Sequence, residues 1–269
     1  MRFGYCLNLQ FLEGDDLSRR IFDAVCESGF DYVEFPLNAL SALSPDKIAG
    51  LKRELAAKGV PCRACNLFFP FDMPIVGPER DRKVIRNYIE KAIATAADIG
   101  METAVFGNGG ARRANDGLSK AGVYADLRDI IEMMDPIAEK NGVTITVEPL
   151  NQKETNMINS YTEAVQLTEG AKHVAAMCDW YHVVMEGQTL DDLQAYPDRL
   201  RHLHIAYSKE RLIPSLADDT EHYRVFVDVV KQLGYSDKLS VEGSLRGNGS
   251  EAAEIGACLE ALKGLFEGR

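Results

Sequence analysis

The chain lacks the features that would place it in a membrane or on a nucleic acid. Its 269 residues contain no run of eighteen apolar residues, which excludes a membrane-spanning helix. Basic residues are outnumbered, 30 Lys and Arg against 41 Asp and Glu, and a net charge of −11 disfavours a phosphate-binding surface. The first residues show neither a basic leader nor a cleavage site, so the expected location is the cytoplasm. We expect neither a nucleic acid nor a membrane as partner.

Motifs that define several common cofactor sites are also missing. The six cysteines include one Cys62-x-x-Cys65 pair and no second pair, so we expect reduced core cysteines instead of a zinc site. No G-x-G-x-x-G follows the first expected strand, which leaves a dinucleotide-binding sheet without support.

Short apolar strands alternate with longer helical patterns along the whole chain. The expected strands are 3–8, 32–35, 61–67, 103–107, 144–148, 174–179, 202–206 and 239–242. Such alternation implies parallel strands joined by right-handed crossovers, and eight units fit a closed barrel better than an open sheet. No linker or low-complexity tract divides the chain. We therefore predict an α/β protein, a single-domain (β/α)₈ TIM barrel over residues 1–269.

The segments between the strands carry helix signals. Apolar stripes with 3.6-residue spacing predict buried helix faces at 84–93, 123–137 and 255–266. Ser44-Pro45 and the capping box of Ser160 and Glu163 predict helix starts. Helix ends are predicted at Gly59, Gly100, Gly142 and Gly234.

Four consecutive strands end in metal-ligand chemistry, at Glu148, Asp179, His204 and Glu242. The carboxyl ends of the strands form the active-site face of such a barrel. Any one of these residues alone would be a solvated rim carboxylate or a core histidine, but carboxylates that converge must be paired or hold a cation. Three oxygen ligands and one nitrogen favour one divalent ion: Mn²⁺, Co²⁺, Mg²⁺ or Zn²⁺. His202, two residues before His204, is expected one layer deeper, where it packs or hydrogen-bonds.

At these residues the sequence resembles the xylose isomerase-like barrels, a superfamily of sugar and sugar phosphate isomerases and epimerases, and among them the ketose 3-epimerases and hydroxypyruvate isomerase. The resemblance covers essentially the whole chain. It rests on Glu148-Pro-Leu-Asn151, Asp179-Trp-Tyr-His182, Glu186-Gly187, His202-Leu-His204 and Val241-Glu-Gly243. It implies that the same four residues hold the metal, and that Glu148 and Glu242 exchange protons with a substrate carbon from opposite faces.

The resemblance also implies substrate contacts. His182 matches a residue that contacts a substrate hydroxyl, and Glu154 matches the acidic residue six positions beyond the first metal ligand. Arg211 is similar to a substrate-binding arginine after the seventh strand, although it is displaced by one residue.

Other loop residues are candidates for the site. Asn66 opens the segment 66–70, an apolar wall with one polar tip, as pockets commonly have. Asn108 lies in the glycine-rich run 106–113, which departs from the ketose epimerases. With Arg112 and Arg113, this run is either an anion cradle for a phosphate or carboxylate or a loop with solvated arginines.

Two further residues beside the expected site have open roles. Glu34 ends the second strand, where it can hydrogen-bond a ligand or another site residue. Trp180, beside Asp179, is either a ligand contact or a packing residue.

The favoured function is a divalent-metal-dependent isomerase or epimerase of a sugar, a sugar phosphate or a small hydroxy-keto compound. Glu148 and Glu242 would act as acid and base around an enediolate that the metal stabilises. The alternatives are a metal-dependent lyase or dehydratase on a sugar-derived substrate and a non-catalytic sugar-binding barrel. A role like that of the superfamily's apurinic endonucleases is disfavoured, because those enzymes need many histidines and this chain has five. The sequence is compatible with a homo-oligomer as well as with a monomer.

Overall fold

Eight parallel strands form a closed barrel in the computed structural model, which describes residues 1–115, 117–218 and 220–267. The strands are β1 (Arg2–Cys6), β2 (Tyr32–Pro36), β3 (Cys62–Asn66), β4 (Thr103–Phe106), β5 (Thr144–Val147), β6 (Val174–Asp179), β7 (Leu200–Ile205) and β8 (Lys238–Val241). Each strand pairs with the next, and β8 pairs with β1 to close the ring, with Tyr5 opposite Val241. The predicted (β/α)₈ fold is confirmed.

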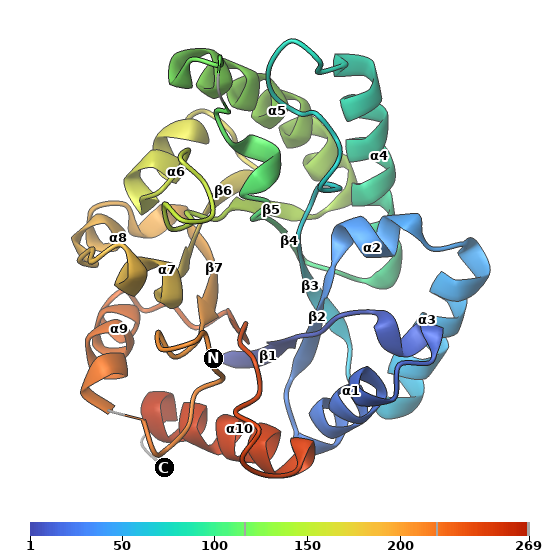
Figure 1. The fold of residues 1–269 in the computed structure, drawn as a ribbon, viewed down its shortest axis with the longest axis vertical. Helices are drawn as coiled ribbons and strands as arrows, with labels where there is room; N and C mark the ends of the chain where they lie inside the picture. The colour runs from blue at the N-terminus through green and yellow to red at the C-terminus, as the bar shows by residue number, and fades with distance from the viewer. Residues whose placement is uncertain (116, 219, 268–269) are drawn as a thin grey trace.

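Helices surround the barrel in chain order (Figure 1). The helices are α1 (Asp16–Ser28), α2 (Leu37–Ala42), α3 (Pro45–Lys58), α4 (Arg82–Ile99), α5 (Lys120–Asn141), α6 (Tyr161–Leu167), α7 (Trp180–Met185), α8 (Asp191–Ala195), α9 (Thr220–Gln232) and α10 (Glu251–Glu267), with 3₁₀ turns η1 (Gln10–Glu13), η2 (Gly110–Arg112) and η3 (Pro197–Arg199). The last helix, α10, packs beside α1, so the helical ring closes as the sheet does. No helix in the described ranges is long and apolar enough to cross a bilayer.

The predicted helix boundaries are confirmed by their caps. Ser44 accepts a hydrogen bond from the Lys47 backbone N–H, and Ser160 with Glu163 forms the complete capping box. Left-handed glycines follow three helices directly, and a fourth lies two residues beyond α9: they are Gly59, Gly100, Gly142 and Gly234.

The core is formed by the outer face of the barrel and the inner faces of the helices. The predicted stripe of α5 is buried, as are Ile85, Ile89 and Ile93 of α4. The stripe of α10 is buried up to Leu262, and Phe266 at its end is half-buried. Val84 was predicted to belong to the α4 stripe, but this is wrong, because 51% of its surface is exposed. One residue before Ile85, it is turned about 100° around the helix and faces outward. The six cysteines are free and five are buried, as expected.

Candidate metal centre and active site

The four predicted metal ligands meet at the carboxyl ends of β5 to β8. One possible ligand atom from each of Glu148, Asp179, His204 and Glu242 lies within 4.8 Å of the others. The His204 Nδ1 atom is 3.3 Å from Glu148 Oε1 and 3.1 Å from Glu242 Oε2. Strand register brings this about, since Asp179 pairs with His204 across β6 and β7.

The two glutamates are held by the barrel although each lies one residue beyond its strand. The Glu148 backbone N–H donates to the Phe106 carbonyl at 3.2 Å, and that of Glu242 donates to the Ile205 carbonyl at 3.1 Å. These bonds continue the hydrogen-bond ladders of the strands by one residue, so the backbone at both glutamates is fixed by the barrel.

The donor set fits a divalent cation. Glu148 Oε1 is buried and has no hydrogen-bond partner among the described residues, which is costly unless a cation or ligand satisfies it. Burial raises the pKa of Glu148, and the neighbouring Glu242 carboxylate raises it further. Burial also acts to raise the pKa of Glu242, but Arg211 and His204 outweigh it and hold that pKa at about 2. Three carboxylates and an imidazole are suitable ligands for Mn²⁺, Mg²⁺, Co²⁺ or Zn²⁺.

His182 lies beside this cluster, on α7 directly after β6. Its Nδ1 atom accepts from the Asn151 backbone N–H at 3.3 Å and lies 2.8 Å from the Asn151 amide nitrogen, which also donates. The ring proton therefore belongs on Nε2. This Nε2 atom is buried and lies 3.4 Å from Asp179 Oδ2, and no hydrogen-bond partner for it is present in the part of the chain that the structure describes. It is a directed donor at the edge of the site.

Arg211 reaches into the site from the loop after β7. Its guanidinium contacts Glu242 Oε2 at 2.5 Å and Asp179 Oδ2 at 3.3 Å, and lies 3.5 Å from Glu154 Oε1. It also stacks 4.7 Å above the ring of Tyr181. The displacement by one residue seen in the sequence therefore does not keep Arg211 from the cluster.

The two predicted asparagines lie at different depths. Asn66 donates from Nδ2 to Glu242 Oε1 at 3.1 Å, so it borders the site. Asn108 is 1% exposed, accepts from the Phe69 N–H at 3.0 Å and donates to the Phe69 carbonyl at 2.7 Å. Both polar ends of Asn108 thus hold the loop after β3. Its substrate contact remains a prediction.

Arg112 fits neither interpretation of the 106–113 run. Arg112 is fully buried and donates to the carbonyls of Phe106 at 3.0 Å and Glu148 at 2.5 Å, so it is neither an anion cradle nor solvated. Burial lowers its pKa to about 10. Arg113 is half-buried and donates to the Lys153 carbonyl. Arg112 joins the ends of β4 and β5 immediately behind the Glu148 carboxylate.

Replacing Arg112 with Met is expected to lower the free energy of unfolding by about 1–3 kcal/mol. The buried Glu148 carbonyl loses its bond to Arg112, and the Phe106 carbonyl keeps only its bond from the Glu148 N–H. Urea denaturation measures this value. The neighbouring Arg113→Met variant is the matched control and is expected to stay within about 0.5 kcal/mol of the wild type. Equal stability of the two variants would contradict the structural role of Arg112.

Sequence reasoning missed three contributors to the site. Asn151 orients His182, Tyr181 supports Arg211, and Gly107 leaves room for Glu148. A Cβ atom on Gly107 would lie 1.9 Å from Glu148 Oε2. The positions of Asn151 and Tyr181 inside the matched motifs were the available signal, whereas nothing in the sequence pairs Gly107 with Glu148. Trp180 stacks on Phe226 with ring centroids 5.4 Å apart, which favours packing.

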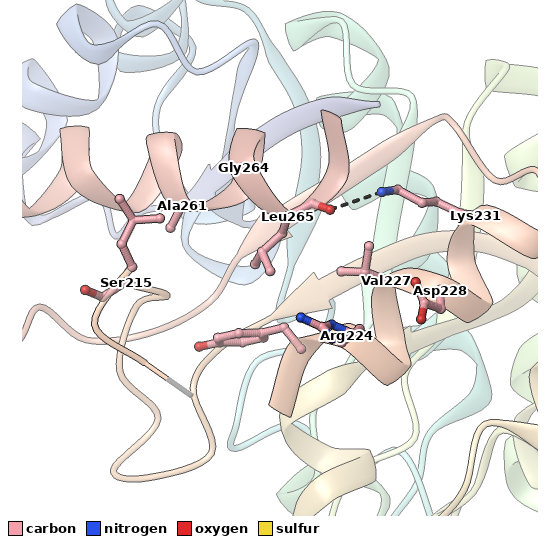
Figure 2. A pocket seen from close by; sticks show the side chains of 10 residues that line it. Ser215, Arg224, Val227, Asp228, Lys231, Ala261, Gly264 and Leu265 are labelled. Atoms are coloured by element: carbon pink, nitrogen blue, oxygen red, sulfur yellow. Dashed lines mark hydrogen bonds between the residues drawn. The ribbon is translucent and has the colours of Figure 1, made fainter. Parts of the chain in front are cut away.

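A cavity of about 320 Å³ adjoins the ligand cluster at Glu242, which is one of its lining residues. Its lining includes Cys6, Asn8, Asn66, Arg211 and Glu242. A separate hollow of about 420 Å³ lies between α9 and α10 on the outside of the barrel, where Lys231 donates to the Leu265 carbonyl (Figure 2). This outer hollow contains none of the predicted site residues.

The fold and the ligand set together define a class of protein. A family model described as xylose isomerase-like TIM barrel matches residues 22–264. The chain belongs to this family, as the resemblance implied.

The chain is also similar to particular sugar epimerases. It is 25% identical to the 3-dehydro-D-guloside 4-epimerase of Escherichia coli (strain K12) over 84% of this chain and 86% of that protein. It is 21% identical to the D-psicose 3-epimerase of Agrobacterium fabrum (strain C58 / ATCC 33970), over 71% of this chain and 68% of the relative. The solved structure of an E. coli 3-keto-D-glucoside 4-epimerase matches with a TM-score of 0.78 at 23% identity, covering 99% of both chains.

Proposed function

We propose that this chain is a divalent-metal-dependent epimerase or isomerase of a keto sugar or keto-sugar derivative. The observation that carries the proposal is that Glu148 and Glu242 both lie against the same nitrogen of His204, in a set of four side chains that could together hold a metal ion. Two carboxylates placed around one substrate carbon can serve as base and acid. The similarity to sugar 3- and 4-epimerases supports the same chemistry.

Glu148, Asp179, His204 and Glu242 would hold the metal ion. When bound, a divalent ion supplies polarisation of the substrate carbonyl and stabilises the negative charge that develops on its oxygen. The protein's own groups then handle the proton. One of Glu148 and Glu242 removes the hydrogen next to the carbonyl, and the other returns a proton from the opposite face, which inverts that carbon.

The surrounding residues would bind and orient the sugar. His182 Nε2–H is an unpaired buried donor suited to a substrate oxygen, and Arg211 offers a guanidinium between Asp179 and Glu154. Asn66 and Glu154 would contact the remaining hydroxyl groups of the sugar. Asn108 would contribute from the loop after β3, which it holds in place. The relatives' names indicate keto sugars with the carbonyl at different carbons, so the position of the reacting carbon is left to experiment.

Deuterium incorporation in D₂O, followed by NMR, tests the proposed function. Protein stripped with EDTA and then loaded with Mn²⁺, Co²⁺, Mg²⁺ or Zn²⁺ would be incubated with free ketoses, ketose phosphates, keto-glycosides and short hydroxy-keto acids. We expect metal-dependent deuterium at one carbon of one compound class, together with its epimer or isomer, and no incorporation in the stripped protein. A control reaction contains each metal ion without protein.

Other outcomes would replace the proposal. Loss of a hydroxyl or cleavage of a carbon–carbon bond after exchange would indicate the lyase or dehydratase. Tight sugar binding without exchange, in metal-loaded protein, would indicate a sugar-binding barrel. Incorporation that is equally fast in stripped protein would rule out the metal dependence.

A further inference from the structure

A fully buried carboxylate, Glu34 of β2, lies directly beneath the candidate metal centre. It is 0% exposed and contacts no Lys or Arg in the described residues. Its Oε1 atom is 3.1 Å from His204 Nε2, and its Oε2 atom is 3.0 Å from His202 Nε2 and 2.5 Å from Ser240 Oγ. Burying an isolated charge here would be costly, and these three contacts compensate it.

The direction of each hydrogen bond follows from the chemistry of the partners. An ionised carboxylate only accepts, so His204 Nε2, His202 Nε2 and Ser240 Oγ all donate to Glu34. Because the Ser240 hydroxyl proton is donated to Glu34, the Tyr32 hydroxyl, 2.8 Å away, must be the donor in its bond with Ser240. His204 therefore carries a hydrogen on Nε2, and its other nitrogen, Nδ1, is the one that faces Glu148 and Glu242.

The barrel is built around this arrangement. The Tyr32 ring occupies the space beside Gly4 on β1, where an added Cβ would lie 2.2 Å from the ring. Glu34, His202 and Ser240 come from β2, β7 and β8, and each side chain is buried inside the barrel. The ring of His202 meets that of His204 edge-on at 5.0 Å. The His204 imidazole is thus restrained by Glu34 of β2 and by the ring of His202 on its own strand, and Ser240 of β8 holds Glu34 in turn.

We propose that Glu34 is the positioning residue of the metal centre: it holds the Nε2 proton of His204 and so presents Nδ1 as the ligand atom. This inference rests on the proposed function, because it assumes that His204 binds the metal. Carboxylates that hold the second nitrogen of a ligating imidazole fix its orientation and raise its basicity, and their removal commonly weakens metal binding. Glu34 would touch neither metal nor substrate.

The first test reads the protonation of His204 in the intact wild-type protein. The full chain is labelled with ¹⁵N-histidine, loaded with diamagnetic Zn²⁺, and studied by long-range ¹H–¹⁵N correlation. The signals are assigned from variants in which one histidine at a time is replaced. We expect a proton on His204 Nε2 and coordination through Nδ1. Coordination through Nε2, with bound Zn²⁺, would overturn the role of Glu34 and leave the metal site intact. No Zn²⁺ bound at His204 would overturn the proposed function itself, and the inference with it.

The second test compares Mn²⁺ affinity in two variants by EPR titration. Glu34→Gln keeps the size of the side chain but loses the negative charge, and we expect about 10–100-fold weaker Mn²⁺ binding. Ser240→Ala removes a donor from the other oxygen of the same carboxylate without touching His204. We expect it to lower the melting temperature and leave Mn²⁺ affinity unchanged. Equal weakening in both variants, or wild-type affinity in Glu34→Gln, would show that Glu34 is merely structural. The NMR test decides if Glu34→Gln does not fold.

Discussion

Glu148→Gln and Glu242→Gln are each expected to lower the rate of epimerisation by about 10²–10⁴-fold, because each removes one partner in proton transfer. The amide retains an oxygen for the metal but cannot take up the substrate proton. If the two glutamates act on opposite faces, each variant keeps one working base. Each should then still exchange the reacting hydrogen of one epimer in D₂O, without inverting the carbon, and the two variants should prefer opposite epimers.

NMR of both epimers in D₂O, with bound metal measured in the same samples, checks this prediction. An exposed glutamate on α5, Glu132→Gln, is the matched control for loss of a carboxylate and is expected to react like the wild type. If exchange is lost with both epimers in one variant and unchanged in the other, a single glutamate moves the proton, as in an isomerase. Near-wild-type epimerisation in both metal-loaded variants would remove the two glutamates from the mechanism.

Gly107→Ala is expected to lower turnover by about 10²-fold, since misplacing a reacting group by about 1 Å has effects of this size. The new Cβ would lie 1.9 Å from Glu148 Oε2, so the carboxylate must leave its present position in the ligand cluster. Gly107 lies outside the left-handed region, and the backbone therefore accepts alanine without strain. Steady-state kinetics and a Mn²⁺ titration measure the two consequences, slower turnover and weaker metal binding.

Gly110→Ala is the matched control for this change. It lies three residues further along the same run, is exposed, and has open space around the added Cβ. We expect wild-type kinetics. If Gly107→Ala also retains wild-type turnover and metal affinity, then Glu148 tolerates displacement and cannot be the precisely placed group that the proposal requires.

Local sequence patterns were sufficient to predict the fold and the four candidate metal ligands. The period of the apolar residues and the caps at Ser44 and Ser160 depend on neighbours within a few residues, so they could be read from the chain alone. The ligands could also be identified, because parallel strands in a barrel bring their carboxyl ends to one face. Asp179 and His204 could be identified as candidate ligands simply because they lie at or near the ends of neighbouring strands.

The roles of several polar residues were decided by tertiary structure. Arg112 bonds a carbonyl 36 positions away, and Asn108 bonds the Phe69 backbone 39 positions away, so neither partner could be read from local spacing. Gly107 matters only because the Glu148 carboxylate folds against it.

The sequence by itself determined that this chain forms a barrel with four candidate metal ligands at one end, because strand order and strand ends are local properties. Only the tertiary structure decided how those ligands are oriented. The contact between Glu34 and His204 joins residues 170 positions apart, across strands that are not neighbours in the barrel. Such contacts depend on barrel curvature and side-chain packing, which a linear pattern of residues does not specify.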